Sequence, residues 1–158
     1  TSGLWFFNSG PNAGASQPHR HLQLLRRSST EVICPRELWF KSKLKEGNRR
    51  EEISKSCYVI KRSKDHLESK TRLYYDYLRL AKKMAVGDPF VDRFPRKPYN
   101  LLITAEWMAL ITRKRDKYNG FSINGLGFAG YLIATKNSNL KWLKDVGPEK
   151  LLEKVMGY

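Results

Sequence analysis

The chain has 158 residues, of which 41% are hydrophobic and 12% aromatic, which is enough to build one domain with a buried core. No run of about eighteen apolar residues is present, which excludes a membrane-spanning helix, and two cysteines are too few for a disulfide framework. Thirty Lys and Arg against fifteen Asp and Glu give a net charge of +15, which favours polyanionic ligands such as nucleotides, nucleic acid or anionic surfaces.

The first residues and the cysteines predict the compartment. Thr1-Ser2-Gly3 has no basic segment that leads into a long apolar stretch, so we expect no signal peptide. Cys34 and Cys57 form no Cys-x-x-Cys pair, and two free thiols are typical of a reducing, cytoplasmic setting. Because the sequence has only three histidines, we expect no tightly bound metal.

The N-terminal part predicts two strands joined by a loop. Leu4–Phe7 is short, apolar and aromatic, and the turn-forming residues 8–12 follow it, so we expect a buried strand that ends in a turn. Further on, His19, His21 and Gln23 alternate with other side chains at the period of a strand. A strand here places all three side chains on one face.

The middle of the chain predicts fewer regular elements. Residues 28–36 show no clear element, and residues 37–40 indicate a short strand or a turn. Residues 41–55 are charged and polar and indicate a mobile loop. A strand is expected over 56–60, followed by an amphipathic helix that starts at 63 or 65 and runs to about 85.

Much of the positive charge lies in the segment 36–70. A solvated loop is the plainer interpretation of such a run of charge. The alternative is a rim that attracts phosphate or an arm that binds RNA, so non-specific polyanion binding stays open.

The C-terminal part predicts a hairpin and a final helix. Residues 98–104 and 107–112 are both strand-like and only two residues apart, which indicates a tight hairpin. Phe121–Ile123 is expected to extend the same sheet, and the glycine spacing in 124–130 permits close approach to another element or a ligand. A last helix is expected from Pro148 to Val155. Antiparallel strands with a few helices give an α+β fold.

The alternation His19-x-His21-x-Gln23 carries the chemistry. A neutral imidazole is a nucleophile for phosphorus when its other ring nitrogen donates to a fixed acceptor. The preceding Gly14-Ala15-Ser16-Gln17 can offer backbone N–H groups and a hydroxyl to phosphate oxygens. Gln23 can donate its amide to a non-bridging oxygen of the same phosphate.

Two segments resemble one known family. Residues 8–23 are similar to the active-site segment of diadenosine tetraphosphate phosphorylases, also called ATP adenylyltransferases. These belong to the histidine-triad superfamily, in the branch with glutamine in place of the third histidine. Residues 99–104, 107–108 and 124–130 resemble the C-terminal region of the same family, in the same order.

The resemblance implies a fold, an activity and a set of roles. The fold is a histidine-triad-like antiparallel sheet with flanking helices, and the activity is phosphorolysis of a dinucleoside tetraphosphate to ADP and ATP. His21 would be the nucleophile that becomes adenylylated, and His19 would support it through a hydrogen bond. Gln23 would contact the α-phosphate. The residues implied to hold the substrate are Asn8, Gly14, Ala15, Ser16, Gln17, Gln23, Asn124, Gly125 and Leu126.

The implied ligands are adenine nucleotides, dinucleoside polyphosphates and inorganic phosphate, without a membrane. Mg²⁺ would arrive with the substrate rather than in a protein site. We predict one domain over 1–158, with the motif in 1–35, a basic and partly mobile insert in 36–70 and a C-terminal family segment in 96–158. Because the family is longer on its N-terminal side, we expect the sheet to be incomplete at the N-terminus.

Two other functions fit the same residues. A uridylyltransferase-like or hydrolytic enzyme could use the same histidine with another acceptor. A basic nucleotide- or RNA-binding remnant without turnover is the alternative from another class. Covalent labelling of His21 separates an enzyme from such a remnant.

Overall fold

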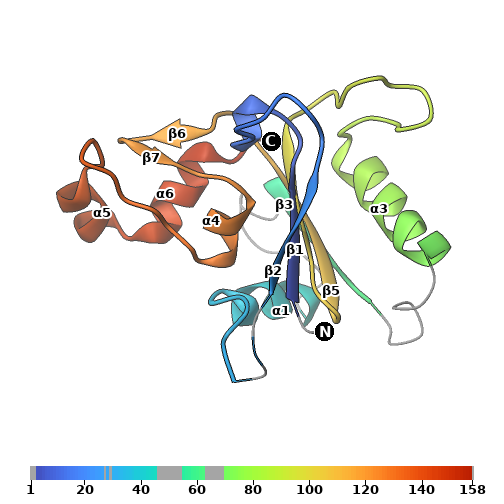
Figure 1. Cartoon of the computed structure of the whole chain (residues 1–158), viewed down its shortest axis with the longest axis horizontal. Coiled ribbons are helices and arrows are strands. Elements are labelled where there is room, and N and C mark those ends of the chain that lie inside the picture. The colour runs from blue at the N-terminus through green and yellow to red at the C-terminus, as the bar shows by residue number, and fades with distance from the viewer. Residues whose placement is uncertain (1–2, 27, 29, 46–54, 63–69, 158) are drawn as a thin grey trace.

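The computed structural model describes residues 3–26, 28, 30–45, 55–62 and 70–157 (Figure 1). Their helices and strands, in chain order, are β1 (Gly3–Asn8), η1 (Pro11–Ala13), β2 (Leu22–Arg26), α1 (Glu37–Lys45), β3 (Cys57–Lys61), α3 (Lys70–Met84), β4 (Tyr99–Ile103), β5 (Trp107–Thr112), β6 (Lys117–Tyr118), β7 (Phe121–Ser122), α4 (Gly125–Ala129), α5 (Leu140–Val146) and α6 (Pro148–Val155). No helix in these ranges is long and apolar enough to cross a membrane.

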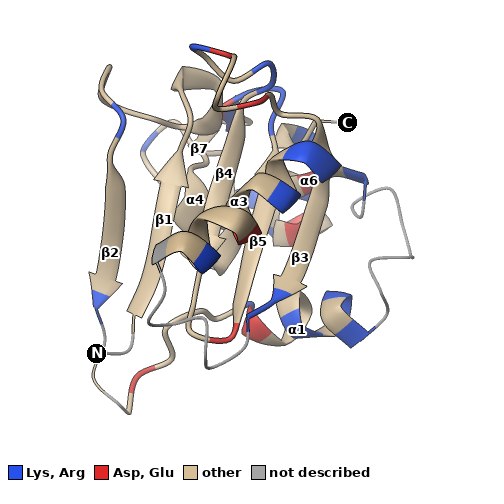
Figure 2. Ribbon diagram, turned by 90° about the vertical axis from the view of Figure 1, so that its right-hand side faces the viewer, with Lys and Arg blue, Asp and Glu red and all other residues tan. Residues whose placement is uncertain are grey.

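An antiparallel sheet of five strands, in the order β2-β1-β4-β5-β3, forms the centre of the fold. The predicted hairpin is confirmed, because β4 and β5 pair up to Ile103 opposite Met108. Helix α3 lies against one face, and α1, α4 and α6 lie on the other (Figures 1 and 2). We call these the α3 face and the α4 face. The predicted α+β class is therefore confirmed.

Strand alternation produces two separate apolar cores, one on each face. On the α4 face, Leu102 of β4 packs with Leu4 and Phe6 of β1, and all three are buried. On the α3 face, Leu101 and Ile103 of β4 pack under α3. Burial on both sides explains why β4 and β5 read as continuous apolar runs.

Helix α1 corrects the prediction of a short strand or turn at 37–40. The run Leu38-Trp39-Phe40 has the aromatic character of a strand, but Phe40 stacks on Trp107 with ring centroids 4.5 Å apart. This long-range contact, with Glu37 in the first turn and Lys45 in the last, stabilises a helix instead. The first part of the predicted mobile loop 41–55 is thus helical, and 46–54 lie outside the described residues.

Three further elements differ from the prediction. Phe121–Ser122 does not extend the main sheet but pairs with Lys117–Tyr118, across an Asn119-Gly120 turn in which both residues have positive φ. Strand β2 begins at Leu22, so the histidines precede it. Helix α5 was not predicted. The final helix has the predicted bounds, and α3 covers 70–84, while its predicted start at 63–69 lies outside the described residues.

Candidate functional site

The predicted motif lies at the end of the sheet where β1 passes into β2. The register pairs Phe6 with Gln23 and Phe7 with Leu22, so Gln23 shares the α4 face with Phe6. The last pair of this register is Phe7 with Leu22, and Asn8 and His21 are the next residue on each side of it. The motif thus faces the side of the sheet that carries α4.

The two histidines of the motif lie side by side. Their ring centroids are 5.1 Å apart, and Nδ1 of His21 is 3.2 Å from the carbonyl oxygen of His19. A carbonyl oxygen only accepts, so Nδ1 must carry the proton and donate. The neutral His21 ring therefore keeps an unshared pair on Nε2. His19 is exposed, whereas His21 is half-buried.

A buried amide network joins the end of β1 to β4 and α4. Oδ1 of Asn8 accepts from Nδ2 of Asn100 at 2.7 Å and from the backbone N–H of Gly125 at 2.8 Å. Asn100, which is fully buried, also donates to the carbonyl of Ala13 at 2.8 Å. Two parts of the site that are more than a hundred residues apart are thereby held together.

Arg113, just after β5, lies at the centre of this network and is 3% exposed. Its acceptors are Oδ1 of Asn100 (2.5 Å) and the carbonyls of Ala13 (3.3 Å), Ile123 (2.8 Å), Arg115 (2.8 Å) and Val155 (3.2 Å). Burial lowers the pKa of the guanidinium to about 10, and the nearby Asp116 opposes this shift. The group therefore stays charged at neutral pH. Neither Arg113 nor Asn100 is predicted as a site residue from the sequence.

The glycine of the motif loop packs against the start of α4. Gly14 has a φ of 78°, and a Cβ there would lie 2.5 Å from the carbonyl oxygen of Ile123. Asn124 caps α4, because its Oδ1 accepts from the N–H groups of Leu126 and Gly127 at 3.0 and 3.3 Å. The structure therefore brings the predicted residues of both segments together.

The contacts divide the predicted substrate-binding residues into two groups. The N–H groups of Gly14 and Ala15 are bonded to carbonyls within the loop, and those of Gly125 and Leu126 are bonded to Asn8 and Asn124. These residues shape the site rather than offer donors. The exposed Ser16 and Gln17 and the half-buried Gln23 remain as donors for a phosphate.

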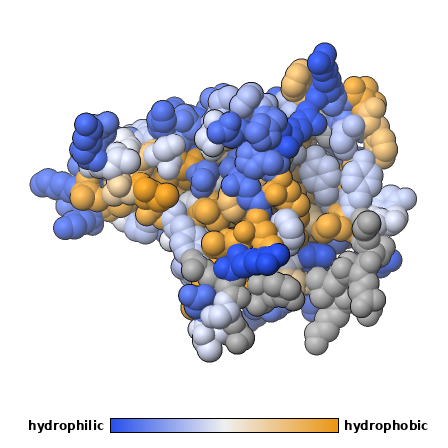
Figure 3. All heavy atoms as spheres, in the orientation of Figure 1, coloured by the Kyte–Doolittle hydropathy of each residue, from blue (hydrophilic) through white to orange (hydrophobic). Residues whose placement is uncertain are grey.

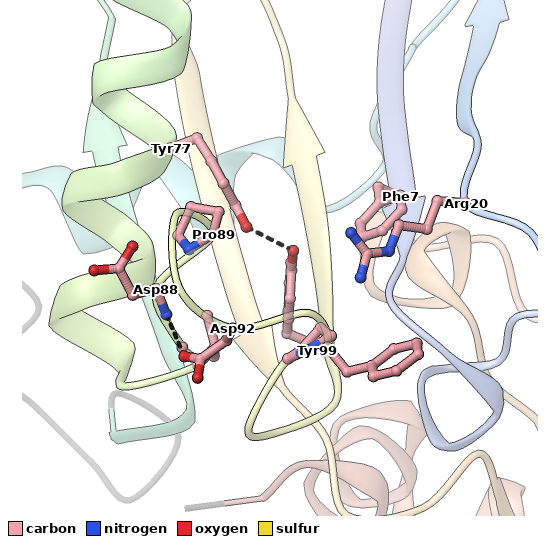
Figure 4. Close-up of a pocket in the computed structure, with 11 residues that line it drawn as sticks. Phe7, Arg20, Tyr77, Asp88, Pro89, Asp92 and Tyr99 are labelled. Atoms are coloured by element: carbon pink, nitrogen blue, oxygen red, sulfur yellow. Dashed lines mark hydrogen bonds between the residues drawn. The ribbon is translucent and has the colours of Figure 1, made fainter.

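A pocket opens on the α3 face beside the motif (Figure 4). The Arg20 guanidinium lies at this pocket and donates to the carbonyl of Arg93 at 2.5 Å. The hydroxyls of Tyr77 and Tyr99 are 2.9 Å apart, and burial raises the pKa of Tyr99 well above its ordinary value. The pocket continues into a groove of about 390 Å³ along α3. The loop that follows α3 exposes apolar side chains near the pocket (Figure 3).

The carboxylates at this pocket are engaged in a local turn. Asp88 accepts from the N–H of Phe90 at 2.9 Å, and Asp92 accepts from the N–H of Asp88 at 2.7 Å. That backbone bond, together with Arg96, lowers the pKa of Asp92. In the described part of the chain, no three His, Cys, Asp or Glu side chains gather where they could hold a metal.

An antiparallel sheet flanked by helices, with a His-x-His-x-Gln segment at one end, defines an α+β domain of the histidine-triad type. Two protein-family models match this chain. The Ap4A phosphorylase N-terminal domain matches residues 1–37, and the ATP adenylyltransferase C-terminal domain matches residues 51–157. The chain therefore belongs to the ATP adenylyltransferase (Ap4A phosphorylase) family.

Two relatives from Saccharomyces cerevisiae match over most of this chain. Diadenosine 5',5'''-P1,P4-tetraphosphate phosphorylase 2 is 23% identical over 155 residues, which cover 90% of this chain and 48% of the relative. Protein APA1 is 26% identical over 151 residues, which cover 85% and 46%. The chain thus spans about half the length of these relatives.

Solved structures support the same fold. The crystal structure of yeast Ap4A phosphorylase Apa2 matches with a TM-score of 0.66 and 20% identity, over 98% of this chain and 56% of Apa2. The structures of Apa2 in complex with Ap4A and with AMP match with TM-scores of 0.68 and 0.63. At these identities the match establishes the histidine-triad-like fold alone.

Proposed function

We propose that this chain transfers the adenylyl group of a diadenosine tetraphosphate to inorganic phosphate through His21. The observation that carries the proposal is the contact from His21 Nδ1 to the His19 carbonyl, which leaves Nε2 as the nucleophile. The family and the Ap4A and AMP complexes of the structural neighbour support an adenine dinucleotide as the substrate.

The reaction takes place in two displacements at the α-phosphorus. In the first, the Nε2 lone pair forms a P–N bond, the bond from phosphorus to the bridging oxygen breaks, and ATP leaves. In the second, a phosphate oxygen attacks the same phosphorus, the P–N bond breaks, ADP leaves and the neutral imidazole returns. The His19 carbonyl stabilises the positive charge that develops on the ring in the first step and is lost again in the second.

The remaining motif residues bind and orient the substrate. Gln23 lies on the same face as Asn8 and is the donor we assign to a non-bridging oxygen of the α-phosphate. Ser16 and Gln17 are assigned to the following phosphates. Mg²⁺ bound to the substrate would neutralise the polyphosphate, since the carboxylates beside the motif are already engaged in a local turn.

Incubation with Ap4A labelled at the α-phosphorus, in Mg²⁺, tests the proposal. We expect a covalent adenylyl label that disappears in His21→Ala and persists in His66→Ala, which replaces the third histidine of the sequence. Added phosphate should then release ADP. Release of AMP by water identifies a hydrolytic enzyme instead, and binding of AMP without any label identifies a nucleotide-binding protein.

A further inference from the structure

The amide of Asn8 has its two ends in different surroundings. Its Oδ1 accepts from Asn100 on the β4 side and from Gly125 at the start of α4. On the other side of β1 lies β2, and His21 is the residue directly before its first residue, Leu22. Since the oxygen and nitrogen of an amide diverge from one carbon, Nδ2 of Asn8 is directed away from the Asn100 and Gly125 donors.

Arg113 acts on the orientation of the Asn8 amide through Asn100. A guanidinium has only donors, so the amide oxygen of Asn100 must face Arg113, to which it is bonded at 2.5 Å. The nitrogen of Asn100 then faces Asn8 and Ala13, to which it donates. Asn8 can accept a hydrogen bond from that NH₂ group only through its oxygen. One permanently charged, buried side chain thus fixes two amides in sequence.

We infer that Arg113 and Asn100 are positioning residues that turn the NH₂ group of Asn8 towards His21, where it donates to a phosphoryl oxygen of the nucleotide. This rests on the proposed function, because the ligand is the phosphate that His21 attacks. A flipped Asn8 would present its oxygen instead and repel the negative charge of the phosphate. The orientation of one amide therefore decides whether the site attracts or repels its substrate.

The orientation can be measured in the ligand-free chain. In a ¹⁵N-labelled sample, the side-chain amide of Asn8 is identified by its loss in Asn8→Asp. We expect nuclear Overhauser contacts from its NH₂ protons to the His21 ring. Contacts to the backbone N–H of Gly125 instead would show the opposite orientation and overturn the inference, whether or not the chain is an active enzyme.

The variant Asn100→Asp tests the relay itself. A carboxylate still accepts from Arg113, but it cannot donate to Asn8 or to the Ala13 carbonyl. The carboxylate then faces Oδ1 of Asn8, which keeps only the Gly125 N–H as a donor, so the amide loses its fixed orientation. The rate of His21 labelling should fall by about 100-fold, which is typical for loss of one oriented donor. Asn137→Asp adds the same charge at an exposed turn and should leave the rate unchanged.

A double variant separates positioning from a merely structural effect. If Asn100 acts through Asn8, then Asn100→Asp should have no further effect on the labelling rate in an Asn8→Ala background. An equal loss in both backgrounds would overturn the inference. If the wild-type chain takes no label, the proposed function fails, and titration with AMP and the amide contacts still decide the orientation of Asn8.

Discussion

The two faces of the sheet differ sharply at the end that carries the motif. Neighbouring residues of β1, Phe7 and Asn8, point to opposite faces, and so do Tyr99 and Asn100 of β4. On the α4 face, the two asparagines join Arg113 in a buried hydrogen-bonded network. On the α3 face, the two aromatic rings lie 5.8 Å apart at the edge of an apolar groove.

The two faces of the same pair of strands therefore have different roles. One face holds particular atoms of the site in place, and the other contributes apolar burial. Hydrogen bonds are directional, so the α4 face fixes particular atoms of the loop and of α4. Apolar packing is non-directional, so the α3 face contributes burial while its groove leaves the β1–β2 edge partly open, with Leu22 48% exposed. We therefore expect substitutions on the α4 face to affect chemistry and stability together, and those on the α3 face to affect stability alone.

The largest effect is expected from Arg113→Met. This variant replaces the guanidinium, which donates the hydrogen bonds at the centre of the α4-face network, with an apolar side chain of similar volume. Its buried acceptors would lose their partner, and each such group costs about 1–3 kcal/mol. We expect the free energy of unfolding in urea to fall by about 3 kcal/mol or more. The control Arg115→Met changes an exposed neighbour. If the Arg113 variant were as stable as this control, the buried network of the α4 face would not stabilise the fold as we expect.

The next effect concerns the contact between the motif loop and α4. Gly14→Ala puts a Cβ into a left-handed residue and against the Ile123 carbonyl, which costs about 1–3 kcal/mol and displaces the loop. Gly10→Ala is the matched control, because Gly10 is extended and a Cβ there meets nothing within 4 Å. Both unfolding and His21 labelling should change in the first variant alone.

A smaller effect is expected on the α3 face. Tyr77→Phe removes one of the two hydroxyls that bond to each other and should lower the free energy of unfolding by about 1 kcal/mol. The rate of His21 labelling should stay at the wild-type value. A loss of labelling without a loss of stability would show that this pocket binds substrate, and the distinction between the two faces would then be wrong.

At neutral pH the smallest effect comes from the buried thiols of the α4 face, whose pH dependence begins only above their ordinary pKa. Burial raises the pKa of Cys34 and of Cys57 to about 12. The unfolded thiols ionise at about 8.5, so stability is unaffected below that pH and falls as the pH rises from there towards 12. A thiol reagent at pH 8 should leave both cysteines unmodified in the folded chain and modify both in urea. Rapid modification of the native chain would contradict their burial.

Sequence periodicity predicted most strands because burial leaves a local pattern. Strands β1, β3, β4 and β5 and helix α6 all appear where apolar runs or a Pro start indicated them. Helix α1 could not be recognised, since its conformation depends on Phe40 meeting Trp107 far along the chain. Strand β7 likewise pairs with β6 and not with the main sheet, because the Asn119-Gly120 turn joins these two short strands.

For the site, the motif indicated which chemistry to expect but not what holds it in place. Nothing local distinguishes Arg113, whose bond to the Ala13 carbonyl spans a hundred residues. A signal for Asn100 did exist, because a polar residue within the buried apolar run of β4 must find hydrogen-bond partners. The division of the loop into shaping and binding residues required the backbone bonds of the folded chain.

We propose that His21 attacks through Nε2 because Nδ1 is held by the His19 carbonyl. Phosphorus–nitrogen coupling in a chain carrying ¹⁵N-histidine, after adenylylation with Ap4A, identifies the nitrogen that bears the phosphorus. We expect an adenylyl group on Nε2 of His21. An adduct on Nδ1, or on His19, would contradict it.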